Sequence, residues 1–197
     1  MVSKEELNKI YTLGGEVRGV TLQTDAKYIL EKRGQEGLNE VEKRLKTLGF
    51  SIPYRTAKTL EWYPLGLRVI SLLVIKDSFN FTDREIREMG KVAPKFSFVV
   101  KFLFKLFGTL KKLSKEVPKY WKEHYSIGSL ETVKLDEKKK IIVIHLKEFK
   151  VHPILCIYLE GYFEGTFRFA KPGGVCQETK CAFKDNLPYH QYTFTWK

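Results

Sequence analysis

The hydrophobic pattern of the chain changes period at Ser129, from the spacing of a helix to that of a strand. The stretch SLETVKLDEKKKIIVIHLKEF alternates in twos around the polar DEKK, which predicts a hairpin with strands at 130–135 and 140–149. The segment that Pro153 opens has a helical pattern. A second hairpin is expected at 175–183 and 189–196. The order β-β-α-β-β therefore commits the end of the chain to a small antiparallel sheet with one helix.

The first half of the chain predicts mainly helices. A short strand is expected at 16–22, after which Thr24 or Asp25 can cap a helix. Gly34 is a natural stop for that helix, and the amphipathic helix behind it ends at Gly49. The stretch LGLRVISLLVIKDSF is apolar on nearly every side, which favours a helix buried in the core.

Further helices are expected before the sheet. In FTDREIREMGK, Thr82 and Glu85 have the spacing of a capping box, and Gly90 is expected to end the helix after two turns. The basic, Phe-rich stretch that follows should be divided by Gly108 and Pro118.

These patterns predict an α+β fold of the α/β-sandwich-like kind, with a helical N-terminal half packed on a C-terminal antiparallel sheet. A length of 197 residues with 43% apolar residues favours a single domain over 1–197. We expect its helical layer at about 23–125 and its sheet unit at about 129–197.

The chain is strongly basic. Lys and Arg number 35 against 23 Asp and Glu, a formal charge of +12, so the surface should attract an anionic partner. A helical projection puts one basic stripe on the Phe-rich segment, formed by Lys101, Lys105, Lys112 and Lys115. That stripe is either a solvated face or a docking face for an anionic membrane or a partner protein. Nucleic acid is disfavoured, because the aromatic residues fall on the buried sides of their elements.

The cysteine content indicates a reducing compartment. Three cysteines form no disulfide framework, and MVSKEELNKIY does not resemble a signal peptide. No apolar run approaches the roughly 20 residues of a membrane span. We expect a cytoplasmic location.

Cysteine and histidine residues near the C-terminus are candidates for a metal site. Strand alternation predicts that Cys176 and Cys181 point to opposite faces unless a bulge intervenes. Cys181 and His190 should be inward neighbours across the second hairpin, with Cys156 on the covering helix as a third ligand. The alternative is a buried thiol beside a hydrogen-bonded core histidine.

Catalysis finds little support in the motifs. The sequence has no G-x-S-x-G elbow, P-loop, His-Glu-x-x-His or G-x-G-x-x-G after a strand. Glu160 and Glu164 could be paired carboxylates, but Arg168 continues their side of the helix, so an exposed charged edge is expected. His152 and Cys156 lie one turn apart without a third catalytic member. We expect a protein that is not an enzyme.

Three stretches, PKYWKEHYSIGSLE, GYFEGTFRF and GGVCQETKCAFKDNLPYHQYTFTW, carry a resemblance to one ligand-binding superfamily. Its members include 4-vinyl-reductase-like domains, Bet3-like subunits of the TRAPP tethering complex, and haem-NO-binding sensors. The first half, including FTDREIREMGKVAPKF, resembles an uncharacterised bacterial branch of it. In the 4-vinyl-reductase-like members a Glu-x-x-Cys precedes a second cysteine. Glu178 and Cys181 match the Glu-x-x-Cys, and His190 stands where the second cysteine would be.

The resemblance implies a pocket for a small hydrophobic ligand between helix and sheet, and often a homodimer. The residues expected to line that pocket are Cys156, Leu159, Phe163, Phe167, Tyr192, Phe194 and Trp196. Haem is disfavoured, because the Tyr-x-Ser-x-Arg motif is absent and neither His124 nor His145 has the expected context. No cofactor is firmly indicated, and zinc is the candidate metal.

Three functions therefore compete. The first is a non-enzymatic ligand-binding or sensory domain of the 4-vinyl-reductase or Bet3-like type. The second is a tethering-like module that docks on membranes or partners through its basic helix. The third is a metal-binding protein that uses Cys181 and His190.

Overall fold

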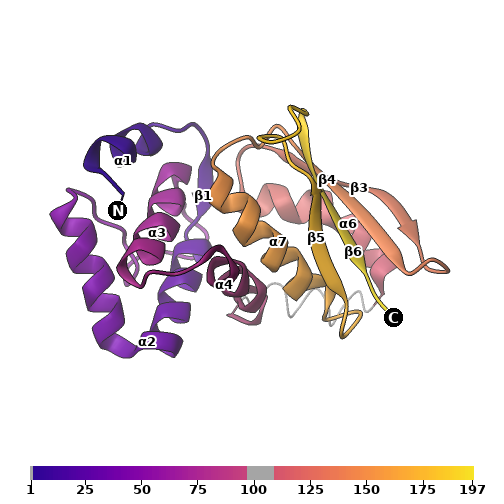
Figure 1. The fold of residues 1–197 in the computed structure, drawn as a ribbon, viewed down its shortest axis with the longest axis horizontal. Helices are drawn as coiled ribbons and strands as arrows, with labels where there is room; N and C mark the ends of the chain where they lie inside the picture. The colour runs from indigo at the N-terminus through magenta and orange to yellow at the C-terminus, as the bar shows by residue number, and fades with distance from the viewer. Residues whose placement is uncertain (1, 97–108) are drawn as a thin grey trace. The chain divides into compact units, whose positions relative to one another are not determined.

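The computed structural model describes residues 2–96 and 109–197, so Lys101 and Lys105 of the predicted basic stripe lie outside the described residues. The chain divides into two compact units, Met1–Ile86 and Arg87–Lys197. Each unit is described by itself. The α+β class and the β-β-α-β-β order after residue 128 are confirmed (Figure 1). The single domain expected over 1–197 stays a prediction.

The first unit is helical with one small sheet. Its elements are α1 (Lys4–Tyr11), β1 (Glu16–Arg18), α2 (Val20–Thr47), β2 (Trp62–Pro64) and α3 (Leu65–Ser78). The patterns above did not predict α1, although Ser3 caps it by accepting a hydrogen bond from the Glu6 N–H. β1 is shorter than the strand expected at 16–22, and it pairs antiparallel with β2.

The break expected at Gly34 is present inside a longer helix. α2 begins at Val20 rather than after Thr24, and Gly34 has a φ of 65°, which interrupts the helical backbone there. Only glycine adopts that left-handed conformation without strain. Thr24 and Asp25 are therefore not caps but buried residues inside the helix.

α3 is buried, as predicted, and one of its buried side chains, Arg68, is charged. Arg68 is 1% exposed and forms an ion pair with Asp25, which is fully buried. The Ser71 hydroxyl donates to the Asp25 carboxylate at 2.7 Å and lies 2.8 Å from the Tyr54 hydroxyl. The pair fixes α2 against α3, because neither charge can stay in the core without the other.

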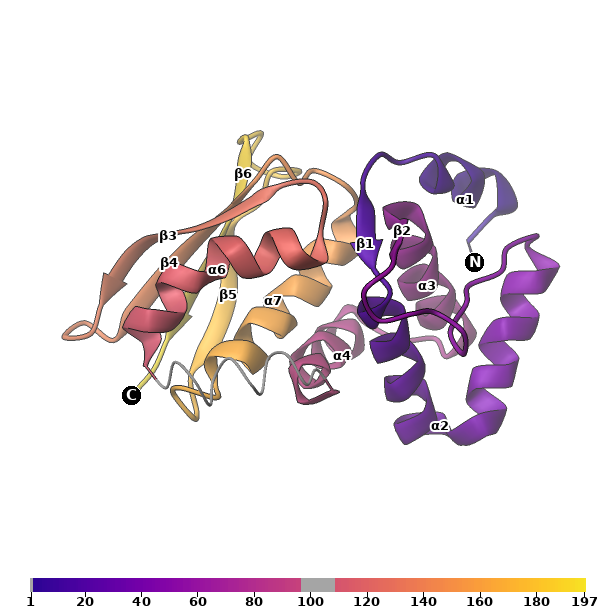
Figure 2. The ribbon, with the colours of Figure 1, turned by 180° about the vertical axis from the view of Figure 1, so that it is seen from behind.

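The second unit is a four-stranded antiparallel sheet covered on one face by two helices. The strands are β3 (Ser129–Asp136), β4 (Ile141–Lys147), β5 (Val175–Lys180) and β6 (Tyr189–Thr195), in the spatial order β3-β4-β6-β5. In Figure 2, α6 (Leu110–His124) and α7 (Pro153–Phe167) lie in front of the sheet. None of the helices in residues 2–96 and 109–197 combines the length and apolar composition needed to span a bilayer.

Pro118 does not divide its helix, contrary to expectation. α6 continues through it, although proline has no N–H to donate to the carbonyl of Ser114 four residues earlier. The Thr132 hydroxyl of β3 donates to that carbonyl instead, at 3.1 Å. The missing helix hydrogen bond is thus replaced by a contact with the sheet.

Gly90 does not end its helix either. The capping box of Thr82 and Glu85 is formed, but α4 (Asp83–Phe96) runs past Gly90. A Cβ at Gly90 would lie 2.0 Å from the Tyr158 carbonyl oxygen of α7. The residue is glycine because two helix backbones meet there, not because the helix stops.

α7 contributes its own glycines to this contact, as the smooth side formed by Gly161 and Gly165 predicted. A Cβ at Gly161 would lie 1.9 Å from the Arg87 carbonyl oxygen. At Gly165 it would lie 2.1 Å from that of Lys91. The second half of α4 therefore packs on α7 at backbone contact distance.

Gly161→Ala should destabilise the protein by about 1–3 kcal/mol or more, because the alanine methyl group would overlap a backbone carbonyl that cannot rotate away. Urea denaturation followed by circular dichroism measures the loss. Gly14→Ala is the matched control, since a Cβ there meets nothing within 4 Å. Equal stability of the two variants would contradict the close helix contact.

Asp25→Ala should cost about 3–5 kcal/mol, because it leaves the Arg68 guanidinium buried without its counter-charge. Glu61→Ala removes the partner of Lys58 in an exposed pair and should cost little stability, because water screens such a pair. Thermal denaturation of both variants compares the two. A loss as small for Asp25→Ala as for Glu61→Ala would show that the buried pair does not fix α2 against α3.

Candidate functional site

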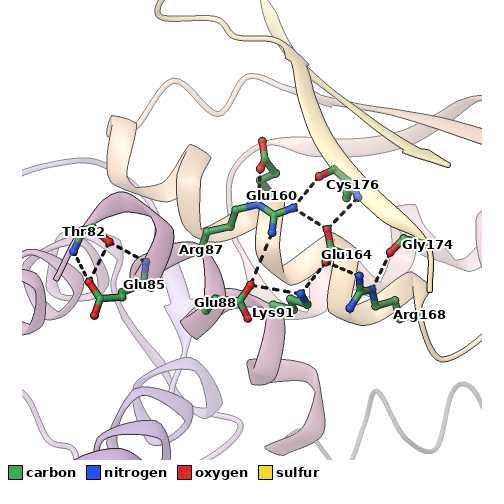
Figure 3. A network of polar contacts seen from close by, with 10 residues as sticks. All are labelled: Thr82, Glu85, Arg87, Glu88, Lys91, Glu160, Glu164, Arg168, Gly174 and Cys176. Carbon is green, nitrogen blue, oxygen red and sulfur yellow. Dashed lines mark hydrogen bonds and ion pairs between the residues drawn. The ribbon is translucent and has the colours of Figure 1, made fainter. Parts of the chain in front are cut away.

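In the second unit, a buried carboxylate on α7 forms ion pairs with three basic side chains. Glu164 is 1% exposed, and its two oxygens bind Arg87 at 2.6 Å, Lys91 at 3.0 Å and Arg168 at 3.0 Å. Arg87 also binds Glu160, one turn earlier on α7. Figure 3 shows the Arg87 side chain between the two carboxylates. The exposed charged edge expected for Glu160, Glu164 and Arg168 is therefore wrong.

The same groups close the free edge of the sheet. β5 is an edge strand, so its outward N–H and C=O groups have no strand partner. The Cys176 N–H donates to Glu164 at 3.1 Å, and the Glu178 N–H donates to Glu160 at 2.8 Å. Arg87 donates to the Cys176 carbonyl at 2.8 Å. These side chains take the place of a fifth strand.

The ion pairs shift the pKa of their members. Burial alone would raise the pKa of the Glu164 carboxyl, but hydrogen bonds from Arg87, Cys176 and Lys91 outweigh it, and the pKa lies below its ordinary value. For Arg87, burial acts to lower the pKa, and the two carboxylates raise it above its ordinary value. Both groups are charged at neutral pH.

A bulge in β5 changes the predicted directions of the cysteines. Cys176 pairs with Phe194 and Glu178 with Tyr192, after which the register shifts before Lys180. The extra residue turns the following side chain inward, so Cys176 and Cys181 are both buried. They do not point to opposite faces, as simple alternation predicted.

Four potential ligands converge beside that bulge. They are Cys156 of α7, Glu178 of β5, Cys181 just after β5 and His190 of β6, and their ligand atoms all lie within 4.8 Å of one another. His190 Nδ1 lies 2.8 Å from a Glu178 carboxylate oxygen and 3.7 Å from Cys156 Sγ. The structure therefore brings together the three residues that the sequence singled out and adds Glu178. Cys176 is not part of the cluster.

The environment of the cluster keeps its helix thiol protonated in the absence of a cation. Burial raises the pKa of Cys156, and the nearby Glu178 carboxylate and Cys181 thiol raise it further. The carboxylate of Glu178 matched a sequence motif, but only the bulge places it on the same side as Cys181.

A cavity of about 30 Å³ lies elsewhere in the same unit, between α6, α7 and the sheet. Leu113, Glu116, Val117, Tyr120, Leu130, Ile144, Tyr162, Phe163, Thr166 and Phe167 line it. The Tyr120 and Tyr162 hydroxyls are 3.1 Å apart, and burial raises the pKa of Tyr162 well above its ordinary value. The Thr166 hydroxyl oxygen is buried and has no hydrogen-bond partner among the described residues.

The predicted pocket residues divide between this cavity and solid packing. Phe163 and Phe167 line the cavity, whereas Tyr192 and Phe194 pack on them with ring centroids 4.8 and 5.2 Å apart. Leu159 is buried, Cys156 belongs to the thiol cluster, and Trp196 stacks against Phe194. The cavity therefore lies on the α6 side of α7, which the sequence did not predict as a pocket wall.

The basic stripe is described in part. Lys112 and Lys115 are exposed on α6, while Leu113, Val117 and Trp121 of the same helix are buried. The arrangement fits a solvated face over an apolar one.

No family model and no curated protein matches the chain. Solved structures do. An H-NOX protein from S. oneidensis in the Fe(II)NO ligation state is similar over 91% of this chain and 99% of that one, with a TM-score of 0.69 at 11% identity. An oxygen-binding H-NOX domain related to soluble guanylate cyclases is similar over 91% and 95%, with a TM-score of 0.65 at 17% identity.

A third structure, reported in a study of haem redox potential and porphyrin distortion, is similar over 91% of this chain and 99% of that one, with a TM-score of 0.60 at 16% identity. At these identities the likeness shows the fold. This fold is that of haem-NO-binding H-NOX domains, and the 4-vinyl-reductase-like and Bet3-like parts of the resemblance are not shown.

These likenesses correct the expectation that haem is disfavoured. The chain has the fold of an H-NOX protein solved in its Fe(II)NO ligation state and of a protein studied for its haem redox potential. The missing Tyr-x-Ser-x-Arg motif was a poor guide, because a fold kept at 11% identity is maintained by packing and one short motif can be lost from it. Zinc, the other cofactor expectation, finds no support in them.

Haem iron takes an axial His, Cys, Met or Tyr ligand. Of the four histidines, His124 binds the Tyr120 carbonyl at 3.0 Å, His145 pairs with Gln191, His152 caps α7 and His190 lies in the thiol cluster. The 30 Å³ cavity is far smaller than a porphyrin and does not fit haem.

The protein should lose stability as the pH falls through the lowered pKa of Glu164. Its stabilising contribution is fully present above the pKa of about 4.3 that an unfolded Glu has, and protonation in the folded state removes it. Glu164→Gln should cost about 3–5 kcal/mol at pH 7 and flatten the acid limb of the profile. Thermal denaturation measured at pH values from 3 to 7, in steps of about one pH unit, tests this.

Glu137→Gln, in the exposed turn between β3 and β4, is the matched control and should keep the wild-type profile. An acid limb that is unchanged in Glu164→Gln would show that another carboxylate carries the transition.

Proposed function

We propose that this protein is a non-enzymatic sensory domain that binds a small, mostly apolar ligand in the cavity between α6 and α7. Two observations support the proposal. The chain has the fold of H-NOX proteins, whose solved structures include NO-ligated and oxygen-bound states. The second and decisive observation is the cavity, because its walls are mostly apolar and the Thr166 hydroxyl in its lining has no hydrogen-bond partner among the described residues.

The size and chemistry of the cavity limit the ligand. A water molecule needs roughly 10–15 Å³ of such space, so a cavity of about 30 Å³ has room for a molecule at least as large as a diatomic gas. The Thr166 hydroxyl can donate one hydrogen bond, and the leucine, valine and phenylalanine side chains contact the apolar remainder. Within residues 2–96 and 109–197, the lining contains no nucleophile with a neighbouring base, which favours binding over catalysis.

A ligand there would act on α7. One side of this helix lines the cavity through Phe163 and Phe167, and another holds β5 through Glu160 and Glu164. A shift of α7 away from α6 therefore changes the contacts of Arg87 with both carboxylates. The ion-pair network is thus the element through which occupancy reaches α4.

We also propose a cytoplasmic location, because a reducing compartment keeps free thiols such as those of Cys156, Cys176 and Cys181 unoxidised. A homodimer and a membrane contact stay predictions from the sequence.

Xenon is the sharpest probe of the cavity, since dry apolar cavities take it up. Crystals pressurised with xenon should show it between Phe163, Phe167 and Thr166. Thr166→Leu should abolish that site by filling it. Thr179→Leu, an exposed change on β5, should leave it intact. A wild-type cavity that stays empty under xenon would remove the proposed ligand site.

Haem binding is tested separately, with the purified protein in solution. Haemin titration followed by the Soret absorbance, with the wild type and Thr166→Leu in parallel, distinguishes a haem site from the cavity. One contradicting result is that NO or O₂ shifts the melting temperature only when haem is bound, and another is that it loses its effect at the cavity once haem binds. Either result would assign sensing to haem iron and contradict the proposal that the cavity binds the ligand. A ligand-induced shift in melting temperature without haem, lost in Thr166→Leu, supports it.

A further inference from the structure

The two edges of the sheet in the second unit differ. At β5, side chains of α7 and α4 bond the outward backbone groups of Cys176 and Glu178. At the opposite edge, β4 is the only strand beside β3 in residues 2–96 and 109–197, so the outward N–H and C=O groups of β3 have no strand partner (Figure 1). We propose that β3 pairs antiparallel with β3 of a second copy of this chain. This interface goes beyond the sensory cavity, because it needs no ligand.

β3 is a long edge strand with an apolar side chain exposed in its middle. It has eight residues, and Val133 is 45% exposed. Edge strands are usually kept very short, because an open row of N–H and C=O groups is a template for another strand. The outer edge of β3 is therefore a surface that a further strand can cover.

The bulge in β3 decides which of its side chains share a face. The register with β4 shifts between Thr132 and Lys134, so the strand contains one extra residue. Glu131 and Lys134 lie opposite residues of β4 that are two apart, and they therefore point to the same face. Leu130 and Leu135 lie opposite residues that are four apart, and they share the other face. That second face is the one that α6 and α7 cover, since Leu130 lines the cavity between these helices and the sheet.

These positions make β3 complementary to itself. Two antiparallel copies can be related by a two-fold axis through the middle of the strand. Glu131 of each copy then lies opposite Lys134 of the other, and Leu130 lies opposite Leu135 on the helix-covered face. Opposite charges and apolar side chains that face each other across two strands stabilise a sheet. Symmetry forms each of these contacts twice.

Neighbouring registers lack this match. A shift by one residue in one direction sets Glu131 against Leu135, which points to the opposite face. The same shift in the other direction sets Leu130 against Lys134, which also differ in face. A shift by two residues in the first direction sets Glu131 against Asp136, and like charges repel. Among these registers, only the first opposes unlike charges on one face.

A lysine and a bulge usually keep an edge strand from pairing. In β3 they favour pairing with a copy of the same strand, because the bulge brings Glu131 and Lys134 to one face, where each meets its opposite charge. Glu131 also binds Lys147 within its own chain, at 2.6 Å, through one carboxylate oxygen. Its second oxygen can accept from Lys134 of the other copy. An unrelated strand lacks the matching charges, so the edge is selective for its own sequence.

Pairing of this kind joins the two sheets into one continuous sheet. A two-fold axis perpendicular to the sheet keeps α6 and α7 of both copies on the same face. The lysine-rich turn after β3 lies at opposite ends of the strand pair in the two copies, so these like charges stay apart. One strand pair is small beside the roughly 1,600 Å² of a standard protein interface. We therefore expect a weak dimer that exchanges with the monomer.

Two complementary charge variants test the register. In Glu131→Lys two lysines of opposite copies repel each other, and in Lys134→Glu two glutamates do. Each variant alone should dimerise about tenfold more weakly than the wild type, or worse, in sedimentation equilibrium. An equimolar mixture of the two should recover the dimer, because both cross-strand contacts then join opposite charges.

Lys138→Glu is the matched control, since it reverses the same charge in the exposed turn after the strand. It should dimerise like the wild type. Circular dichroism should show that all three variants are folded, because the substituted side chains are at least partly exposed.

Hydrogen exchange locates the interface in the wild type without any substitution. Exchange of the backbone amides in residues 129–136 should slow as the protein concentration rises. Exchange in β5 should not depend on concentration, because the outward N–H groups of Cys176 and Glu178 are already bonded within the chain.

Three results would overturn the proposal. One is a wild-type protein that stays monomeric up to its solubility limit. Another is a pair of charge variants that each dimerise alone as tightly as the wild type, which would place the contact on another surface. The third is a wild-type dimer whose formation leaves exchange in residues 129–136 unchanged.

Discussion

The sheet unit depends on one buried carboxylate. Glu164 forms ion pairs with three cations and accepts a hydrogen bond from the Cys176 N–H. The surface of α7 thereby substitutes for the strand that the edge strand β5 lacks on its outer side. A buried charge is stable only when it is fully paired, which makes the positions of α4, α7 and β5 interdependent. The glycine contacts add to this constraint, because they let the backbones of α4 and α7 approach until Arg87 reaches both carboxylates.

The sequence predicted the elements whose signals are local. The period change at Ser129, the Gly34 break and the Thr82 capping box each depend on residues within a turn or two, and all three are present. Gly90 and Pro118 were misjudged for a shared reason. Each is tolerated inside a helix because a distant element, the backbone of α7 or the hydroxyl of Thr132, compensates for it. Such compensation has no signature in neighbouring residues.

The candidate sites show the same limit. The strand pattern predicted that Cys181 and His190 lie close together, as they do in the structure. It did not predict that Glu178 lies beside them, because that depends on a bulge that no neighbouring residue indicates. Glu160 and Glu164 read as exposed because charge usually lies at the surface. The partner that they share, Arg87, comes from a helix some seventy residues away in the sequence, beyond the reach of any periodicity. The expectation that haem is disfavoured was wrong because it was judged from one motif and the context of two histidines instead of the fold.

The proline in α6 has a consequence for movement. Proline at position 118 leaves the Ser114 carbonyl without its helix donor, and Thr132 is the only described group shown to donate to it. A slide of α6 along β3 would break this hydrogen bond in addition to disturbing the packing of the buried side chains of α6. This hydrogen bond therefore fixes one point of α6 relative to β3. We expect a molecule that enters between α6 and α7 to swing α6 about that point like a lever, with the largest displacement at its ends.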